Sequence, residues 1–133
     1  MAGLTLKVLA GEFSVHRLDA DAPVPDAVLQ SGPYWIGKTD EELSIVCASG
    51  VPVPGSRADA GWSCMKVSGP LDLDATGILA GLSSALAGAG VSLLALSTHD
   101  TDYLLVRSRS LSRAIAALAG AGYAVDPPTA AGS

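Results

Sequence analysis

The chain has 133 residues, of which 49% are hydrophobic and 16% charged, and its formal net charge is -5. This is the composition of a folded protein, and the length suits one compact unit or two very small ones, which excludes a large enzyme with separate cofactor and substrate lobes. An acidic chain lacks the Lys and Arg surface that neutralises phosphates, so we expect neither a nucleic acid nor an anionic membrane as a partner.

The first half of the chain predicts short strands with little helix. Two strands joined as a hairpin are expected around Gly11, because apolar residues alternate on both sides of it, at Leu4, Leu6, Val8, Phe13 and Val15. Residues 26–30 follow two prolines and predict at most a turn or two of helix, and residues 34–36 and 43–47 predict short strands. Residues 49–61, rich in Pro and Gly, are interpreted as a linker.

The second half predicts strands and helices in the order β-α-β-β-α-β. Strands are expected at 62–67, 91–96, 103–107 and 123–125, with a break at Gly69-Pro70. Two amphipathic helices are expected, one carrying Ile78, Leu79, Leu82 and Leu86 and the other Leu111, Ala114, Ile115 and Leu118. This order predicts an α+β, ferredoxin-like unit in which two helices cover one face of a four-stranded antiparallel sheet. So small a unit is expected to need a pairing partner from the N-terminal half or from another chain.

The predicted domains are therefore an N-terminal half at 1–58, a C-terminal domain at 59–126 and a flexible tail at 127–133. The uncharged stretch 75–97 is long enough to span a bilayer, but Gly88-Ala-Gly90 interrupts it and its period changes halfway. We interpret it as a helix followed by a strand. Two cysteines and the absence of a signal-peptide pattern favour a reducing, cytoplasmic compartment.

Three sequence patterns suggest a nucleotide, metal or catalytic site, but each lacks the neighbouring residues that such a site needs. Residues 32–39 match the nucleotide-binding pattern G-x-x-x-x-G-K-[ST], yet bulky residues stand where backbone amides would wrap phosphate, and we expect a loop in which Thr39 and Glu42 bond locally. The segment His99-Asp100-Thr101-Asp102 is either a metal or acid–base cluster or a polar turn, and a metal site normally needs more converging donors. Cys47 and Cys64 are expected to be buried on strands, so no metal, cofactor or catalytic residue is predicted.

A binding site is predicted where the first helix of the C-terminal domain begins. The free amides and positive dipole of a helix N-terminus can hold a carboxylate, while Asp72, Asp74, Asp100 and Asp102 can meet an ammonium or guanidinium group. A zwitterionic amino acid would be complemented at both ends. The alternative is that Asp72 or Asp74 caps the helix while Asp100 and Asp102 form a turn.

Several long motifs resemble the small bacterial ACT-domain proteins related to the CASTOR arginine sensors and to the regulatory tail of aspartate kinase. The resemblance covers Leu4 to about Val125, and its motifs are residues 34–47, Gly61-Trp62, Gly69-Pro-Leu-Asp72, Thr76-Gly-Ile-Leu79 and residues 96–106. It implies two tandem ACT-like halves, the first of them degenerate, with sheets joined edge to edge in a homodimer and an amino acid bound at an ACT–ACT interface.

The same resemblance assigns the pocket to Thr76, Gly77, Ile78 and Asp102, with Asp72 and Asp74 as the nearest acids before the helix. The arginine sensors have a glutamate just before this helix, where this chain has Ala75. The sequence thus favours a non-enzymatic regulatory protein that binds an amino acid. A structural or protein-interaction module without a ligand is the alternative, and an enzyme is the least favoured class.

Overall fold

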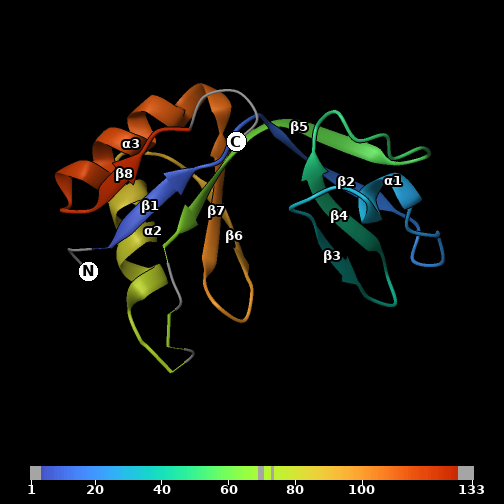
Figure 1. The fold of residues 1–133 in the computed structure, drawn as a ribbon, viewed down its shortest axis with the longest axis horizontal. Coiled ribbons are helices and arrows are strands. Elements are labelled where there is room, and N and C mark those ends of the chain that lie inside the picture. The colour runs from blue at the N-terminus through green and yellow to red at the C-terminus, as the bar shows by residue number, and fades with distance from the viewer. Residues whose placement is uncertain (1–3, 69–70, 73, 129–133) are drawn as a thin grey trace. The chain divides into compact units, whose positions relative to one another are not determined.

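A computed structural model describes residues 4–68, 71–72 and 74–128 (Figure 1). The predicted break at Gly69-Pro70 and the tail from residue 129 lie outside the described residues. The chain divides into two compact units: Gly11–Trp62, here the N-terminal unit, and Met1–Ala10 with Ser63–Ser133, here the C-terminal unit. Residues 4–10 therefore group with the C-terminal unit, whereas the predicted N-terminal half was 1–58.

The C-terminal unit has the α+β architecture that its sequence predicts. Its strands are β1 (Thr5–Val8), the second half of β5 (Arg57–Val67), β6 (Leu93–Ser97), β7 (Asp102–Arg107) and β8 (Ala124–Asp126). Its helices are α2 (Ile78–Gly88), the 3-10 turn η1 (Ser108–Ser110) and α3 (Leu111–Gly120). From β5 onward the order β5-α2-β6-β7-α3-β8 is the predicted βαββαβ unit, with a mainly antiparallel sheet.

The predicted hairpin at the start of the chain is wrong. Strand β1 pairs antiparallel with β5 and parallel with β8, which gives the sheet order β8-β1-β5-β7-β6. Strand β2 instead pairs with β4 and with the first half of β5. Alternation of Leu6 and Val8 with polar residues predicts which face of a strand is buried, but it does not specify the neighbouring strand. The pairing partner that the βαββαβ unit was expected to need is therefore β1.

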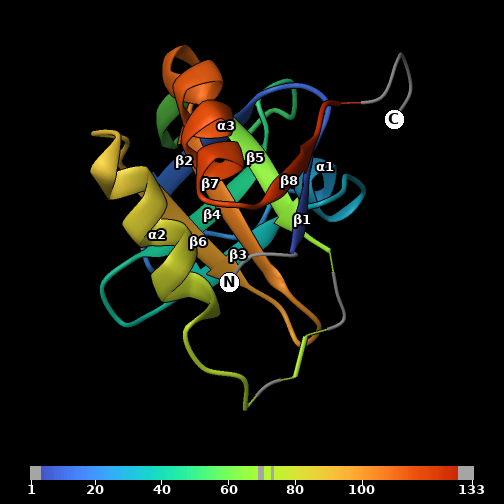
Figure 2. The ribbon, with the colours of Figure 1, turned by 90° about the vertical axis from the view of Figure 1, so that its left-hand side faces the viewer.

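Helices α2 and α3 lie on the same face of this sheet (Figure 2). The core between them is aliphatic, since Leu82 and Leu86 of α2 and Leu118 of α3 are fully buried against Val67 and Leu104 of the sheet. Small residues such as Ala114 let the helices approach closely. Leu79, which the sequence placed on the buried stripe, is 37% exposed.

The N-terminal unit has a sheet but almost no helix. It contains β2 (Phe13–Leu18), the four-residue α1 (Asp26–Leu29), β3 (Trp35–Lys38), β4 (Leu43–Ala48) and the first half of β5, in the sheet order β3-β4-β2-β5. The end of the predicted linker is strand, because β5 begins at Arg57. The core is formed by Leu18, Val28, Leu43, Ile45 and Cys47, with Val51 and Val53 packed against it. Segments without regular structure thus close this core.

Candidate functional site

Helix α2 begins with an uncapped N-terminus. Its N-cap residue is Gly77 in the left-handed conformation (φ 81°), and in the described part of the chain no side chain caps the helix. The Gly81 N–H donates to the Gly77 carbonyl at 2.9 Å, so the amides before it, at residues 78–80, have no acceptor within the helix. These amides and the helix dipole favour an anionic group at this end of α2.

The prediction that Asp72 or Asp74 caps α2 is wrong. Asp72 lies five residues before the N-cap position, and its Oδ1 accepts a hydrogen bond from the Asp74 N–H at 2.9 Å. This is a local Asx turn, a common role for aspartate outside helices. The positive φ that the backbone adopts at residue 77 suits glycine, which offers no capping oxygen.

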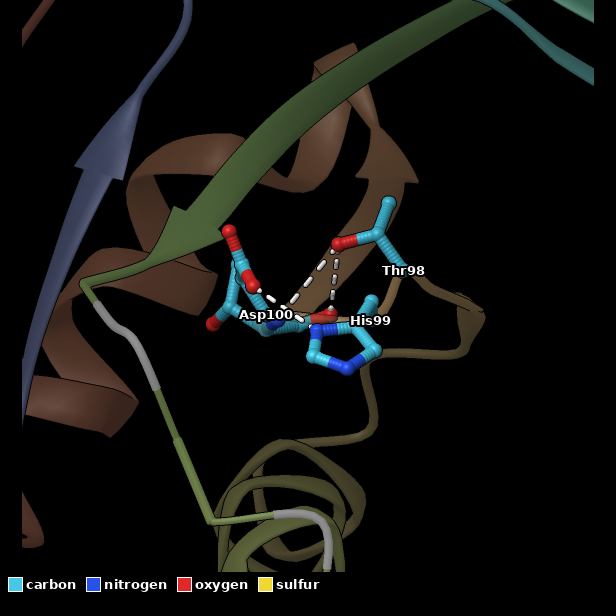
Figure 3. Close-up of polar contacts among 4 residues, drawn as sticks. Thr98, His99 and Asp100 are labelled. Carbon is cyan, nitrogen blue, oxygen red and sulfur yellow. Dashed lines mark hydrogen bonds and ion pairs between the residues drawn. The ribbon is translucent and has the colours of Figure 1, made fainter.

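The turn between β6 and β7 presents a second set of polar groups. The Thr98 N–H donates to the Thr101 carbonyl at 2.9 Å, which closes the turn, and the Ser97 hydroxyl donates to Asp102 Oδ1 at 2.6 Å. Figure 3 shows Thr98, His99 and Asp100 at its tip, where His99 Nδ1 lies 3.0 Å from Asp100 Oδ1. Both side chains of that pair are largely exposed. The polar-turn interpretation of this segment is therefore confirmed.

Two hydrogen bonds attach this turn to the chain that leaves β5. The Thr101 hydroxyl donates to the Val67 carbonyl at 2.6 Å, and the Leu71 N–H donates to the Asp100 carbonyl at 2.7 Å. Thr101 is only 5% exposed. The bonds fix the position of Asp102, the neighbour of Thr101, relative to the residues that precede α2.

A cleft of about 290 Å³ lies between the start of α2 and this turn, entirely within the C-terminal unit. Leu71, Ala75, Ile78 and Leu79 supply apolar surface, and the carboxylates of Asp72, Asp100 and Asp102 supply negative charge. The cleft thus combines unpaired helix amides, which suit an anion, with carboxylates, which suit a cation. Its volume is at the low end of the range for ligand pockets, about 300–1,000 Å³.

The sequence predicted part of this lining. Asp72, Gly77, Ile78 and Asp102 line the cleft, whereas Asp74 and Thr76 are exposed residues of the same approach to α2 outside the described lining. Ser97, Thr98 and Thr101 were not predicted as site residues. The sequence signal for these three residues is a run of hydroxyl side chains around a tight turn. Such a run predicts the turn, but it does not predict which side chains point into a cleft.

The other patterns have structural roles. Residues 35–38 and 43–48 form the antiparallel β3–β4 hairpin in place of the strand, loop and helix of a nucleotide site, and the Thr39 hydroxyl accepts from the amides of Glu41 and Glu42. Cys47 and Cys64 are buried on strands, as predicted, and burial raises the pKa of Cys64 to about 12. Across the described residues no group of His, Cys, Asp and Glu side chains suited to a metal ion is found.

Two family models match separate parts of the chain. The ACT domain model matches residues 57–120, and a separate model of an N-terminal domain matches residues 11–53. No significant match is found among curated proteins. In the described part of the chain no helix is long and apolar enough to cross a membrane.

The chain also resembles solved structures. Atu0741 of Agrobacterium tumefaciens is 38% identical, with a TM-score of 0.87 over 95% of this chain and 94% of that one. The chain therefore belongs to the same family as Atu0741. VC0802 of Vibrio cholerae, described as a possible transport protein, is 18% identical with a TM-score of 0.72 over 90% of each chain. The regulatory subunit of aspartate kinase from Thermus thermophilus is 12% identical with a TM-score of 0.61 over 84% of this chain and 93% of that one. At such low sequence identity, the structural similarity to VC0802 and to the aspartate kinase subunit shows a shared fold.

Proposed function

We propose that this ACT-domain protein is a non-enzymatic regulator that binds a free amino acid in the cleft between α2 and the β6–β7 turn. The observation that carries the proposal is the uncapped start of α2, which faces the Asp102 turn across a cleft of about 290 Å³. The amides at residues 78–80 would hold the α-carboxylate of the ligand. Asp102, already oriented by the Ser97 hydroxyl, would hold its ammonium group or a cationic side chain.

The comparisons support the same proposal from a second direction. The ACT domain match and the fold shared with regulatory subunits of aspartate kinase favour a regulatory role over a catalytic one. By analogy with the arginine sensors that the sequence resembles, the functional form would be a homodimer with its ligand at an ACT–ACT interface. Arginine is the first ligand to test, although Ala75 stands where those sensors have a glutamate.

Thermal denaturation in the presence of each of the twenty amino acids tests the proposal. A ligand at one hundred times its dissociation constant stabilises the folded state by about 2.7 kcal/mol, which raises the melting temperature by several degrees. We expect one or a few amino acids to produce this rise, and Asp102→Asn to abolish it because the cationic end of the ligand loses its charged partner. Asp126→Asn, an exposed aspartate on β8 outside the described cleft lining, is the matched control and should retain the response.

Two results would contradict the proposal. If none of the amino acids shifts the melting temperature or gives heat in calorimetry, the protein is instead an interaction module with an unused cleft. If Asp102→Asn and the control respond alike, the ligand binds elsewhere. Solution mass, measured with and without the active amino acid, tests the proposed homodimer separately.

A further inference from the structure

His16 is a buried histidine that the proposed cleft does not use. It lies on β2 in the N-terminal unit, opposite Ile45 of β4 and Ala58 of β5, and is only 6% exposed. Ser14 and Leu18, two residues before and after it on the same strand face, are also buried. His16 therefore points to the side of the sheet on which the core of this unit packs.

The imidazole holds one end of an irregular segment. His16 Nδ1 is hydrogen-bonded to the hydroxyl of Ser56 at 2.8 Å, and the hydroxyl of Ser14 is bonded to that of Ser49 at 2.8 Å. Two side chains of β2 thus attach both ends of segment 49–56, here called the strap. Between these ends, Val51 and Val53 of the strap pack against the core.

The second ring nitrogen of His16 has no protein partner. Nε2 is buried, and among the described residues nothing forms a hydrogen bond with it. A neutral ring leaves one nitrogen unpaired, whereas a protonated ring would place a charged N–H donor there without an acceptor. A buried, unpaired charge is much more costly than a buried, unpaired neutral group.

We propose that the strap is pH-sensitive: when His16 takes up a proton, the Ser56 end of the strap detaches and the imidazolium becomes hydrated. Detachment breaks the His16–Ser56 bond, while the Ser14–Ser49 bond at the other end contains no titratable group. Opening is therefore expected to begin at Ser56 and to uncover the core under Val51 and Val53. This device lies in the N-terminal unit and uses none of the residues that line the cleft.

The charged groups around His16 do not provide a counter-ion for the proton. From β4, the titratable group on the buried side of the sheet is Cys47, whose thiol stays neutral because burial raises its pKa. A shallow hollow that His16 also lines carries charges of both signs, from Arg17, Glu42, Arg57 and Asp59. The nearby charges are thus balanced, and desolvation is the dominant effect: burial lowers the pKa of His16 below its usual 6.5.

The direction of the pH effect follows from this shift. Because the detached or unfolded state binds a proton more readily than the closed state, closure is favoured at high pH and weakens as the pH falls below 6.5. The loss is complete once the pH is below the pKa of the closed form. Above about pH 7.5 the equilibrium should be independent of this group.

An NMR titration of the full chain tests the proposal. We expect the pKa of His16 to lie below 6.5, because burial disfavours the charged form of the ring. The second histidine, His99, has a side chain that is 85% exposed in the other unit and supplies a control variant. Amide hydrogen exchange at Val51 and Ser56, corrected for its intrinsic pH dependence, should accelerate about tenfold per pH unit between 6.5 and the lower pKa.

Matched variants distinguish a pH effect on the strap from general unfolding of the protein in acid. His16→Gln should remove the pH dependence of exchange in the strap, and His99→Gln should leave it unchanged. If His16→Gln does not fold, Ser56→Ala provides the test. This variant removes the His16–Ser56 hydrogen bond but keeps the histidine, so the pKa of His16 should rise toward 6.5. The proposal is overturned if the pKa of His16 is not below 6.5, or if strap exchange has the same pH dependence in the His16→Gln and wild-type chains.

Discussion

The two units enclose their cores in different ways. In the C-terminal unit two helices of ten or more residues cover one sheet face, and the buried contacts are almost entirely aliphatic. In the N-terminal unit the single helix has four residues, and the strap completes the cover through hydrogen bonds from Ser14 and His16. The first core depends on apolar area. The second depends in addition on two side-chain hydrogen bonds, one of which, His16–Ser56, contains a titratable ring.

This difference also separates the two proposed activities. The C-terminal unit places its polar groups in a solvent-accessible cleft at one end of α2, where a ligand can pair with them. The N-terminal unit places a titratable ring in its core, where a proton can disrupt it. We therefore expect an amino acid to act on one unit and pH on the other.

Leu82→Ala should have the largest effect on stability and tests whether the units unfold separately. Leu82 is fully buried on α2, and truncation of such a residue costs about 2–5 kcal/mol. Val28→Ala removes a smaller buried side chain from α1 and should destabilise the N-terminal unit by less. Urea unfolding can distinguish the units, since circular dichroism follows α2 and α3 while tryptophan fluorescence follows Trp35 and Trp62, which both belong to the N-terminal unit.

In Leu82→Ala the dichroism transition should therefore move to lower urea by more than the fluorescence transition. The control is Leu79→Ala, on the same helix. Because Leu79 is 37% exposed, its truncation should lower the free energy of unfolding by much less than Leu82→Ala does. If both probes shift equally in Leu82→Ala, the chain unfolds as one cooperative unit and the contrast between the two cores has no thermodynamic meaning.

Thr101→Val should have the next largest effect and tests the attachment of the β6–β7 turn. The substitution keeps the side-chain shape but removes the donor to the Val67 carbonyl, leaving a buried acceptor unpaired at a cost of about 1–3 kcal/mol. Thr98→Val is the control, because the bonds of its hydroxyl are longer, at 3.3 and 3.4 Å, and the residue is exposed. Chemical denaturation monitored by dichroism measures both changes.

Thr101→Val also bears on the cleft. If the turn is held in place by Thr101, amino acid binding should weaken in Thr101→Val beyond what the loss of stability explains, and it should be preserved in Asp126→Asn, which lies outside the described cleft lining. Unchanged stability and binding in Thr101→Val would show that the bond to Val67 does not position the turn.

Much of the C-terminal unit could be predicted because its signals are local. The periodicity of Ile78, Leu82 and Leu86 predicts both the helix and its buried face, and the polar run at 99–102 predicts the turn. Strands β2, β3 and β4 of the N-terminal unit were likewise predicted to within a few residues, whereas the first half of β5 was interpreted as linker. The pairing of β1 was not predicted. A strand of four residues specifies which of its faces is buried, but its neighbours depend on residues 65–67 of β5, far along the chain.

Prediction of the candidate site was limited in the same way, by contacts between residues far apart in the sequence. Sequence identified Asp102 and the start of α2, and it predicted Asp72 and Asp74 as ligand-binding acids, with helix capping as the alternative. The structure excludes that alternative. An aspartate shortly before an apolar helical pattern is the usual cap, and only the backbone conformation at Gly77 shows that the helix starts later. Thr101 was missed because its importance comes from a carbonyl 34 positions earlier, a contact that no local pattern encodes.

Gly77→Ala should have the smallest effect and tests how the cleft depends on the start of α2. A side chain at φ 81° strains the backbone by about 1 kcal/mol, although nothing lies within 4 Å of the added carbon. Gly88→Ala, at the other end of the same helix, adds the same methyl group without a positive φ and should be neutral or slightly stabilising. Thermal denaturation gives the stability change, and the amino acid response gives the binding change. Because the strained residue must shift to relax, the amides at 78–80 should turn from the cleft, so binding should weaken more than stability does. A variant that loses stability but binds normally would show that these amides do not hold the carboxylate.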